Sequence, residues 1–467
     1  MGQAQQERMF LNEALYKAEH LRHAQGENIH DRIVANIYAE AEALASDVVK
    51  LTGAGKDLDR RIDDIVTSRI FGFPLMFILL GLVFWLTITG ANYPSALLSA
   101  LLFGLEEKLT ALFQMLGAPA WLHGIAVLGT YRSLAWVLSV MLPPMAIFFP
   151  IFTLLEDLGY LPRVAFNLDR AFQRVGAHGK QALTMSMGFG CNAAGVVAAR
   201  IIDSPRERLI AILTNNFVPC NGRFPTLILL ATIFCGAEAA SISGKIAAIA
   251  TVTMLVLTGV AVTLLVSRVL SRTLLKGKPS FFSLELPPYR KPQIGRVIIR
   301  SFLDRTIFVM GRAAAVAAPA GAVIWILANV SAGDLPILAH AAGLLDPLGR
   351  AVGLDGVIML AFLLGLPANE IVIPIMLMSY LSTGTMLEIG STVAMKGLLV
   401  SQGWTWVTAL NMMLFSLLHF PCGTTLLTIH KETGSIKWAA LAAVITTATA
   451  IIVCFLVAQV ARLFNLI

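Results

Sequence analysis

Charged residues are scarce in this sequence: 13% of its 467 residues are Asp, Glu, Lys or Arg, 57% are hydrophobic, and the mean hydropathy is +0.76. A soluble chain carries about 25% charged residues, so a soluble globular protein is excluded. Several apolar runs reach the ~20 residues that a helix needs to cross a bilayer. The sequence therefore predicts an all-α, polytopic membrane protein with about eight transmembrane helices. The net charge of +7 belongs mostly to loops, and we expect no nucleic-acid partner.

Several catalytic motifs are also missing. The phosphate-binding pattern Gly-x-x-x-x-Gly-Lys-[Ser/Thr] is absent, and the nearest fragments, at 55–57 and 179–181, both fail it. His-Glu-x-x-His and Gly-x-Ser-x-Gly are absent too, so an intramembrane hydrolase lacks support. Trp and Tyr number seven each, which is sparse for a site that stacks on aromatic rings. We expect neither an enzyme nor a permanently bound cofactor.

Apolar runs and basic loops predict the topology. The expected spans are 71–90, 131–155, 209–235, 244–267, 306–330, 356–381, 404–428 and 437–463. Residues 94–117 hold Glu106, Glu107 and Lys108 among leucines and predict an interfacial amphipathic helix instead. We expect a cytoplasmic helical segment at 1–68, a first membrane half at 69–267, a basic cytoplasmic loop at 268–305 and a second half at 306–467. The positive-inside rule then places both termini in the cytoplasm, and the polar N-terminus predicts no cleavable signal peptide.

Cysteine is rare, and all five cysteines lie in apolar segments: Cys191, Cys220, Cys235, Cys422 and Cys454. This placement suits buried thiols or metal ligands better than an extracellular disulfide framework. Cys235 and Cys454 stand alone in apolar runs, where a free cysteine acts as a small buried hydrophobe.

Two stretches of the first half combine thiols with residues that break helices. Residues 188–192 read Gly-Phe-Gly-Cys-Asn and residues 217–223 read Phe-Val-Pro-Cys-Asn-Gly-Arg. Interrupted backbone in hydrocarbon is tolerated only where it is buried in protein or lines a cavity, and transporters build mid-bilayer sites in this way. Thiols beside an amide favour a borderline divalent transition metal. The predicted metal ligands here are Cys191, Asn192 and Cys220, and the predicted backbone breaks are Gly188, Gly190 and Pro219. The alternative is that the thiols only fill space.

The second half repeats this pattern weakly. Residues 365–369 match 188–192 at the spacing of Gly and Asn, and Pro-Cys recurs at 421–422. Two copies of a broken helix followed by Pro-Cys predict an inverted repeat around one pathway. A carboxylate inside an apolar run costs about 2.5–3.5 kcal/mol, so Glu370 is predicted to be functional. The predicted ligands are Asn369, Glu370 and Cys422, with breaks at Gly365, Pro367 and Pro421.

Two further pairs of residues each allow two interpretations. Glu156 and Asp157 end an apolar run, where they either line the exit of a metal pathway or cap a helix at the interface. Met185 and Met187 either offer thioethers to the same site or fill the core.

These motifs resemble the membrane domain of the ferrous iron transporter B family (FeoB) over nearly the whole chain from about residue 60. The anchors of the resemblance are 155–163 (Leu-Glu-Asp-Leu-Gly-Tyr-Leu-Pro-Arg), 188–192, 217–220, 421–425 and 431–435 (Lys-Glu-Thr-Gly-Ser). The family usually carries an N-terminal GTPase domain, which is missing here; residues 1–68 resemble only the end of the linker to it. The sequence also has Ala193 where a Pro is expected after the Asn, and Asn369 where many members place a Lys before the Glu.

The resemblance implies two Gate modules that move Fe²⁺ across the bacterial plasma (inner) membrane. It assigns Cys191 and Cys220 to the first Gate, and Glu370 and Cys422 to the second. The GTPase is then a separate partner chain, or this chain works without one, or the sequence is a fragment of a longer protein. The other expected partners are a small FeoA-like protein and further copies of this chain. Two alternatives stay open: a Gate-domain transporter of a nucleoside-like solute, and a membrane metal sensor or scaffold that transports nothing.

Overall fold

The computed structural model describes residues 17, 29–48, 55–68, 70–235, 242–277, 289, 293–386 and 392–464, and these residues are almost entirely helical. The chain divides into two compact units, Met1–Ile62 and Asp63–Ile467. The helix α2 (Ile29–Val48) lies in the first unit, and α3 (Gly55–Val66) begins there. The second unit contains every residue of the predicted site.

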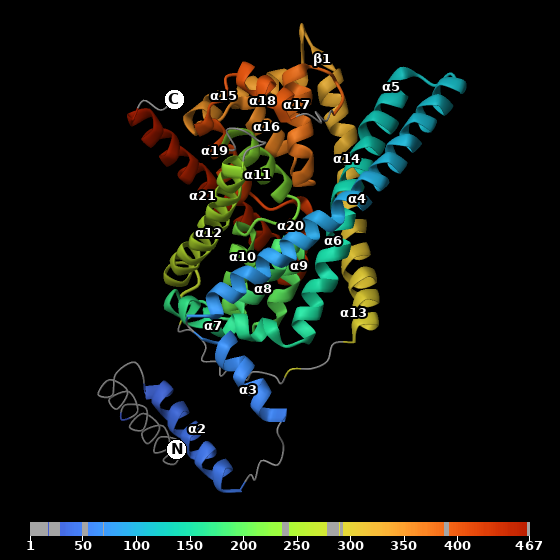
Figure 1. The fold of residues 1–467 in the computed structure, drawn as a ribbon. Coiled ribbons are helices and arrows are strands. Elements are labelled where there is room, and N and C mark those ends of the chain that lie inside the picture. The colour runs from blue at the N-terminus through green and yellow to red at the C-terminus, as the bar shows by residue number, and fades with distance from the viewer. Residues whose placement is uncertain are drawn as a thin grey trace, which may run out of the picture. The chain divides into compact units, whose positions relative to one another are not determined.

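The second unit consists of helices in two successive sets (Figure 1). The first set, which includes short π-helical and 3-10 segments labelled η, comprises α4 (Gly72–Met115), α5 (Ala120–His123), η1 (Gly124–Tyr131), α6 (Arg132–Asp157), α7 (Tyr160–Arg174), α8 (Gln181–Gly190), α9 (Asn192–Ala198), η2 (Ala199–Ile201), α10 (Pro205–Thr214), η3 (Asn215–Phe217), α11 (Phe224–Leu230), η4 (Ala231–Cys235) and α12 (Ile242–Arg272). The second set comprises α13 (Ile294–Arg300), η5 (Ser301–Ile307), α14 (Phe308–Asn329), β1 (Ser331–Ala332), β2 (Leu335–Pro336), α15 (Ile337–Ala351), α16 (Gly356–Leu364), η6 (Asn369–Ile371), α17 (Val372–Leu381), α18 (Thr392–Ser401), α19 (Trp406–Leu418), α20 (Gly423–Thr433) and α21 (Ile436–Leu463). The strands β1 and β2 form a short antiparallel pair.

Five of the described helices are long and apolar enough to cross a membrane, or six if the bent pair α15–α16 counts as one span. The five coincide with the spans expected at 71–90, 131–155, 244–267, 404–428 and 437–463. The other three expected spans correspond to shorter apolar helices, at Phe224–Phe234, Ala313–Asn329 and Asn369–Leu381. The all-α membrane architecture is confirmed.

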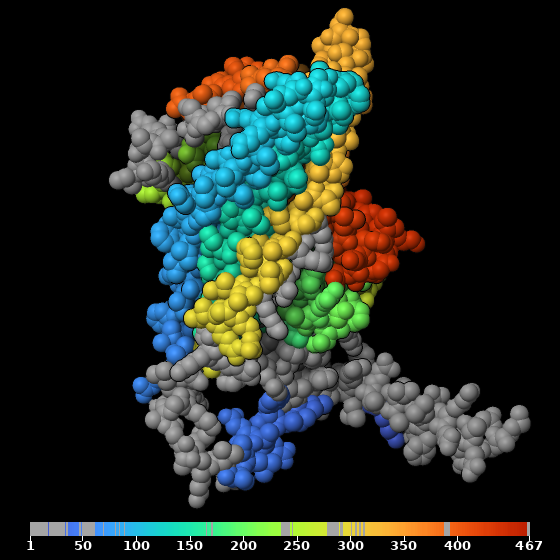
Figure 2. Space-filling view, turned by 90° about the vertical axis from the view of Figure 1, so that its right-hand side faces the viewer, coloured from blue at the N-terminus to red at the C-terminus, as the bar shows by residue number. Residues whose placement is uncertain are grey.

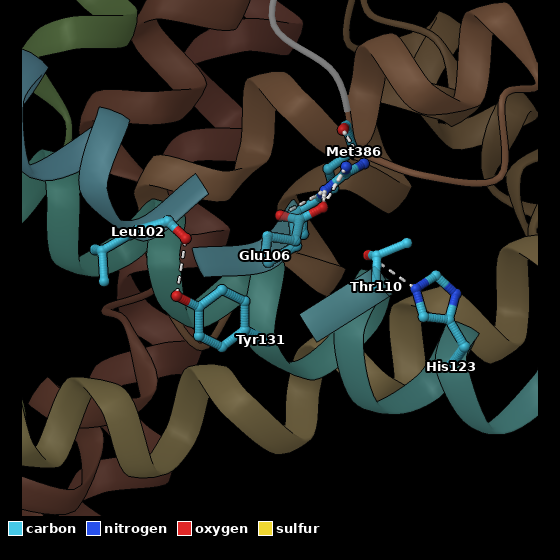
Figure 3. A network of polar contacts seen from close by, with 7 residues as sticks. Leu102, Glu106, Thr110, His123, Tyr131 and Met386 are labelled. Carbon is cyan, nitrogen blue, oxygen red and sulfur yellow. Dashed lines mark hydrogen bonds and ion pairs between the residues drawn. The ribbon is translucent and has the colours of Figure 1, made fainter. Parts of the chain in front are cut away.

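The separate interfacial helix expected at 94–117 does not form. Residues 72–115 make one 44-residue helix, α4, which continues through Pro94. Glu106 is buried because its carboxylate pairs with Arg132 of α6 at 2.6 Å, and the Tyr131 hydroxyl donates to the Leu102 carbonyl at 2.8 Å (Figure 3). A charge that is paired against a neighbouring helix does not need the headgroup region.

The described residues form two hydrophobic cores, and each core includes residues of both sets of helices. The first core gathers around Phe148 and Phe149 of α6 and Leu213 of α10; the second gathers around Phe362 of α16 and Phe415 of α19. The helices α4, α6 and α14 lie side by side as blue, teal and yellow bands in Figure 2. In the middle of the fold, α9 contacts α8, α10 and α20 (Figure 1). Helix α9, which begins at a predicted break, therefore contacts helices of both sets.

An ion pair ties α3 to the first set. Arg163 of α7 is buried and donates from Nε to Asp63 Oδ1 at 2.9 Å and from Nη2 to Asp63 Oδ2 at 3.1 Å. Tyr289 donates to the same carboxylate at 2.8 Å. The hydrogen bond from Arg163 holds the pKa of Asp63 below its ordinary value. The last residue of the 155–163 motif thus acts as an anchor between helices.

Candidate metal centre

The first break separates α8 from α9. Helix α8 ends at Gly190, Cys191 is extended at φ −155° and ψ 126°, and α9 begins at Asn192. Gly190 is required by close packing, because a Cβ there would lie 2.3 Å from Cε1 of Phe148. Of the break predicted over 188–192, the structure has only Cys191 extended, whereas Gly188 lies inside α8 and does not interrupt the helix.

The second break of this half lies between η3 and α11. Val218 is extended, and Pro219 to Gly222 are not helical. The backbone N–H of Asn221 donates to the carbonyl oxygen of Gly190 at 3.3 Å. This bond brings Cys220 beside Cys191, so the two breaks of the first half form one structure.

The second half repeats the first break in its backbone angles. Ala368 is extended at φ −154° and ψ 123°, nearly the angles of Cys191, and it also immediately precedes an Asn. The second Pro-Cys again follows a helix end, because α19 stops at Leu418 and α20 begins at Gly423. The backbone N–H of Gly423 donates to the Leu366 carbonyl at 2.6 Å. The weak repeat in the sequence thus corresponds to a repeated local geometry.

The two halves meet at Glu370. A Cβ on Gly222, two residues after Cys220, would lie 1.8 Å from Glu370 Oε1, so the carboxylate packs directly on the backbone of the first half. Cys220 lies within electrostatic range of Cys422 and Glu370, and Cys191 lies within range of Cys220 and Cys422. Cys191, Cys220 and Glu370 are each at most 9% exposed. The buried Cys191, Cys220 and Glu370 and the partly buried Cys422 thus lie in the same part of the fold, and we call these four predicted ligands the thiol–carboxylate cluster.

The cluster is not a preassembled coordination sphere. Within the described ranges, no three His, Cys, Asp or Glu side chains stand close enough together to hold a metal ion. The four described cysteines are free, and the Cys422 sulfur contacts Thr425 Oγ1 at 3.2 Å. Soft thiols with one carboxylate suit a borderline divalent ion, and coordination requires these side chains to move together.

The other predicted ligands lie in two different places: the amides next to the breaks, and two carboxylates at an exposed helix end. Asn192 and Asn369 are buried next to the breaks, and the side-chain oxygen of each has no hydrogen-bond partner in the described part of the chain. Glu156 and Asp157 are exposed at the C-terminal end of α6 and are not part of the cluster. Met185 and Met187 are buried in the first core.

Arg223 is the residue that sequence reasoning missed. It is fully buried, and its guanidinium donates to the carbonyl oxygens of Leu417 (2.7 Å), His419 (3.2 Å) and Phe420 (3.1 Å), and to Asn216 of its own half. The last carbonyls of a helix lack intrahelical partners, and Arg223 supplies partners at the end of α19. The signal was available: a charged residue three positions after Pro219-Cys220 in an apolar chain.

The family models match the chain over the same segments. A model described as "Gate: Nucleoside recognition" matches residues 138–234 and 310–436, and each match contains one pair of breaks. A model described as "Ferrous iron transport protein B C terminus" matches residues 252–304.

Curated relatives extend the likeness along the chain. A relative from Staphylococcus aureus named "Fe(2+) transporter FeoB" is 31% identical over 91% of this chain and 62% of its own length. Relatives of the same name come from Methanocaldococcus jannaschii (26% identical, 92% of this chain and 63% of the relative) and Synechocystis (29%, 90% and 66%). The chain thus spans less than two thirds of the length of these relatives, and no solved structure matches it. Its two Gate segments, its FeoB C-terminal segment and its match along about 90% of the chain thus support a likeness to the membrane domain of the FeoB family.

Proposed function

We propose that this chain is the permease part of a FeoB-type system that moves Fe²⁺ across the bacterial inner membrane into the cytoplasm. The observation that carries the proposal is the gathering of Cys191, Cys220, Cys422 and Glu370 in the same part of the fold, where the broken helices of the two halves meet. Relatives named Fe(2+) transporters that match about 90% of the chain support the same substrate.

Fe²⁺ is the transported substrate, and no resident cofactor is needed. The ion sheds water onto backbone carbonyls and amide oxygens at the breaks, with Asn369 Oδ1 as one buried acceptor. The thiols bind it as thiolates, and Glu370 balances its charge. Glu156 and Asp157, exposed at the end of α6, line the exit toward the cytoplasm, the side on which both termini lie.

The coupling energy comes from outside the described site. The given sequence has no phosphate-binding loop, and the proposal assigns GTP-dependent gating to a GTPase on a separate chain. A relative from Porphyromonas gingivalis is named "Fe(2+) transport protein A/Fe(2+) transporter FeoB fusion protein" (26% identical over 88% of this chain and 52% of the relative). This fusion supports a small FeoA-like partner for the present chain. Further copies of the chain complete the proposed assembly.

Iron uptake in cells without other ferrous importers tests the proposal. Cys220→Ser is expected to lower the initial rate of Fe²⁺ uptake by roughly tenfold, because a hydroxyl is a poor replacement for a soft ligand. Cys454→Ser is the matched control, since Cys454 is a free cysteine buried in the hydrophobic core, and its sulfur donates to the Asn411 carbonyl at 3.5 Å. Equal uptake in the two variants would remove the thiol of Cys220 from the mechanism.

Substrate competition separates iron transport from the other two functions. We expect divalent transition metals, and not nucleosides, to compete with Fe²⁺. Inhibition by nucleosides would favour the nucleoside-like solute suggested by the description of the Gate model. Absence of metal flux in proteoliposomes, with metal binding retained, would favour a sensor or scaffold.

A further inference from the structure

Two helices from opposite halves pack against each other beside the thiol–carboxylate cluster. Helix α9 begins directly after Cys191, and α20 begins directly after Cys422. The two helices contact each other in the middle of the fold (Figure 1). Cys191 and Cys422 lie within electrostatic range of each other, so the helices start close together. We call this packing the α9–α20 contact.

An ion pair joins the far ends of these two helices. Arg200 of η2, the short segment that continues α9, donates from Nε to Glu432 Oε2 at 2.7 Å and from Nη2 to Glu432 Oε1 at 2.7 Å. Glu432 lies in the last turn of α20; its side chain is 12% exposed, and that of Arg200 is 67% exposed. The two parallel bonds fix the orientation of both groups, whereas access to water keeps such a pair weak. The pair is therefore suited to open and close reversibly.

One face of α20 connects the cluster to this ion pair. Polar side chains recur along it at intervals of three and four residues: Cys422, Thr425, Thr428 and Glu432. Such spacing places side chains on the same side of a helix. Thr425 and Thr428 are each 1% exposed, and the Cys422 sulfur contacts Thr425 Oγ1 at 3.2 Å. Because one end of this face meets the cluster and the other meets Arg200, buried hydroxyl groups lie between the proposed metal site and the ion pair.

The ion pair lies at the base of a helical hairpin. Lys180, which directly precedes α8, donates from Nζ to the Ile201 carbonyl at 2.9 Å and to Asp203 Oδ2 at 3.0 Å. Helices α8 and α9 therefore form a hairpin with Cys191 at its tip and Arg200 at its base. Helix α7 leads from the end of α6 to this base (Figure 1). The ion pair and the end of α6 thus belong to the same face of the second unit.

The repeat provides a comparison for the α9–α20 contact. Its counterpart would join α17, which follows the break at Ala368, to α11, which follows the break at Cys220. Helix α11 packs on α12 and α19, and α17 packs on α16. No comparable packing joins α11 to α17, both of which the structure describes in full. Transporters built from two repeats expose a central site to one face at a time. By this comparison, the side of the α9–α20 contact is the closed one.

We propose that the α9–α20 contact, held by Arg200 and Glu432, is the gate that closes the thiol–carboxylate cluster from the face where α6 ends. The gate opens when the ion pair separates and α9 moves away from α20. Glu432, once released from Arg200, offers its carboxylate to the leaving cation, and the hydroxyl groups of α20 line the way. The direction, from the cluster to the cytoplasm, rests on the proposed function, whereas the gate itself rests on the contact between the helices.

Chemical labelling of Cys422 in membrane vesicles tests the gate. The full chain is expressed in bacterial cells, and inside-out and right-side-out vesicles are treated, without iron, with a positively charged methanethiosulfonate that does not cross membranes. Mass spectrometry of the peptide that contains Cys422, a partly buried free thiol, gives the initial labelling rate. This rate follows the population of the open state. Inside-out vesicles present the cytoplasmic face to the reagent.

Three variants and a control locate the gate. Glu432→Gln removes the ion pair and is expected to raise the labelling rate of Cys422 roughly threefold to fivefold in inside-out vesicles, as the modest strength of an exposed pair implies. Arg200→Glu adds repulsion and is expected to raise the rate further. The double variant with Arg200→Glu and Glu432→Arg is expected to label like the wild type. Asp203→Asn is the matched control, because Asp203 pairs with Lys180 at the same base but within one half; its rate should equal that of the wild type.

Two results would overturn the gate. The first is a labelling rate that neither Glu432→Gln nor Arg200→Glu changes. The second is a rise that the double variant does not reverse, or that occurs equally in right-side-out vesicles or in Asp203→Asn, since each would indicate a general loosening of the fold. Unchanged labelling would leave the iron proposal standing. Equal iron uptake in Cys220→Ser and Cys454→Ser would remove Cys220 from the metal site and leave the gate intact.

Discussion

The two break pairs share a backbone and differ in their side chains. Cys191 and Ala368 have almost identical angles and each precedes an Asn, yet one carries a thiol and the other a methyl group. The first pair contributes two thiols, Cys191 and Cys220. The second contributes one thiol, Cys422, and one carboxylate, Glu370. A repeated backbone therefore carries an asymmetric set of proposed ligands, in which the first half would supply soft donors and the second the compensating negative charge.

The halves also differ in the contact that each one makes with the other. In the first half, Arg223 donates hydrogen bonds to the carbonyls at the end of α19. In the second half, the Glu370 side chain packs on Gly222 of the first half. The contact from the first half is a network of hydrogen bonds, whereas the contact from the second is a close approach to a glycine. We therefore predict that the Arg223 contact mainly determines the stability of the fold, and that the Glu370 contact mainly determines the geometry of the proposed metal site.

The largest effect is expected from Arg223→Met, which keeps the apolar stem but removes every donor. Carbonyl groups of Asn216, Leu417, His419 and Phe420 lose this partner in a buried region. We expect a loss of about 3–5 kcal/mol in the free energy of unfolding, measured by chemical denaturation in detergent. Arg350→Met is the control, because Arg350 is 77% exposed in its ion pair with Asp346, and its loss should stay within about 1 kcal/mol. Similar losses in both variants would show that the two halves are not joined through Arg223.

A smaller and more selective effect is expected from Gly222→Ala. The added Cβ would lie 1.8 Å from Glu370 Oε1 and must displace the carboxylate. We expect metal uptake to fall by roughly tenfold, equivalent to about 1.4 kcal/mol, with a modest loss of thermal stability. Gly104→Ala serves as the control, since a Cβ at Gly104 of α4 meets nothing within 4 Å. Uptake equal to that of Gly104→Ala would mean that the position of Glu370 does not matter.

The smallest effect is expected from Ala368→Cys, which makes the second break match the first. A fourth thiol near the cluster should favour more thiophilic ions. We expect the zinc concentration that half-inhibits iron uptake to fall by roughly threefold to tenfold. Ala361→Cys is the control, because Ala361 is fully buried in α16, outside the break. An unchanged zinc sensitivity would indicate that the extended residue of a break does not face the ion.

The sequence was sufficient where the information is local. Gly190, Pro219 and Pro421 mark where helices end, because glycine and proline act on their own backbone, and the apolar runs mark the membrane helices. The positions that were not predicted depend on distant partners. The carbonyl acceptors of Arg223 on Leu417, His419 and Phe420 lie about two hundred residues away. Glu106 looked interfacial until its pairing with Arg132 was visible.

The chemistry of the thiols also links the proposed metal site to protons. Arg223 lies within electrostatic range of Glu370, so the carboxylate serves a resident cation as well as an arriving divalent ion. Thiols coordinate metals only after deprotonation. In the proposed function, loading the cluster therefore releases hydrogen ions, and metal flux is linked to local acidity.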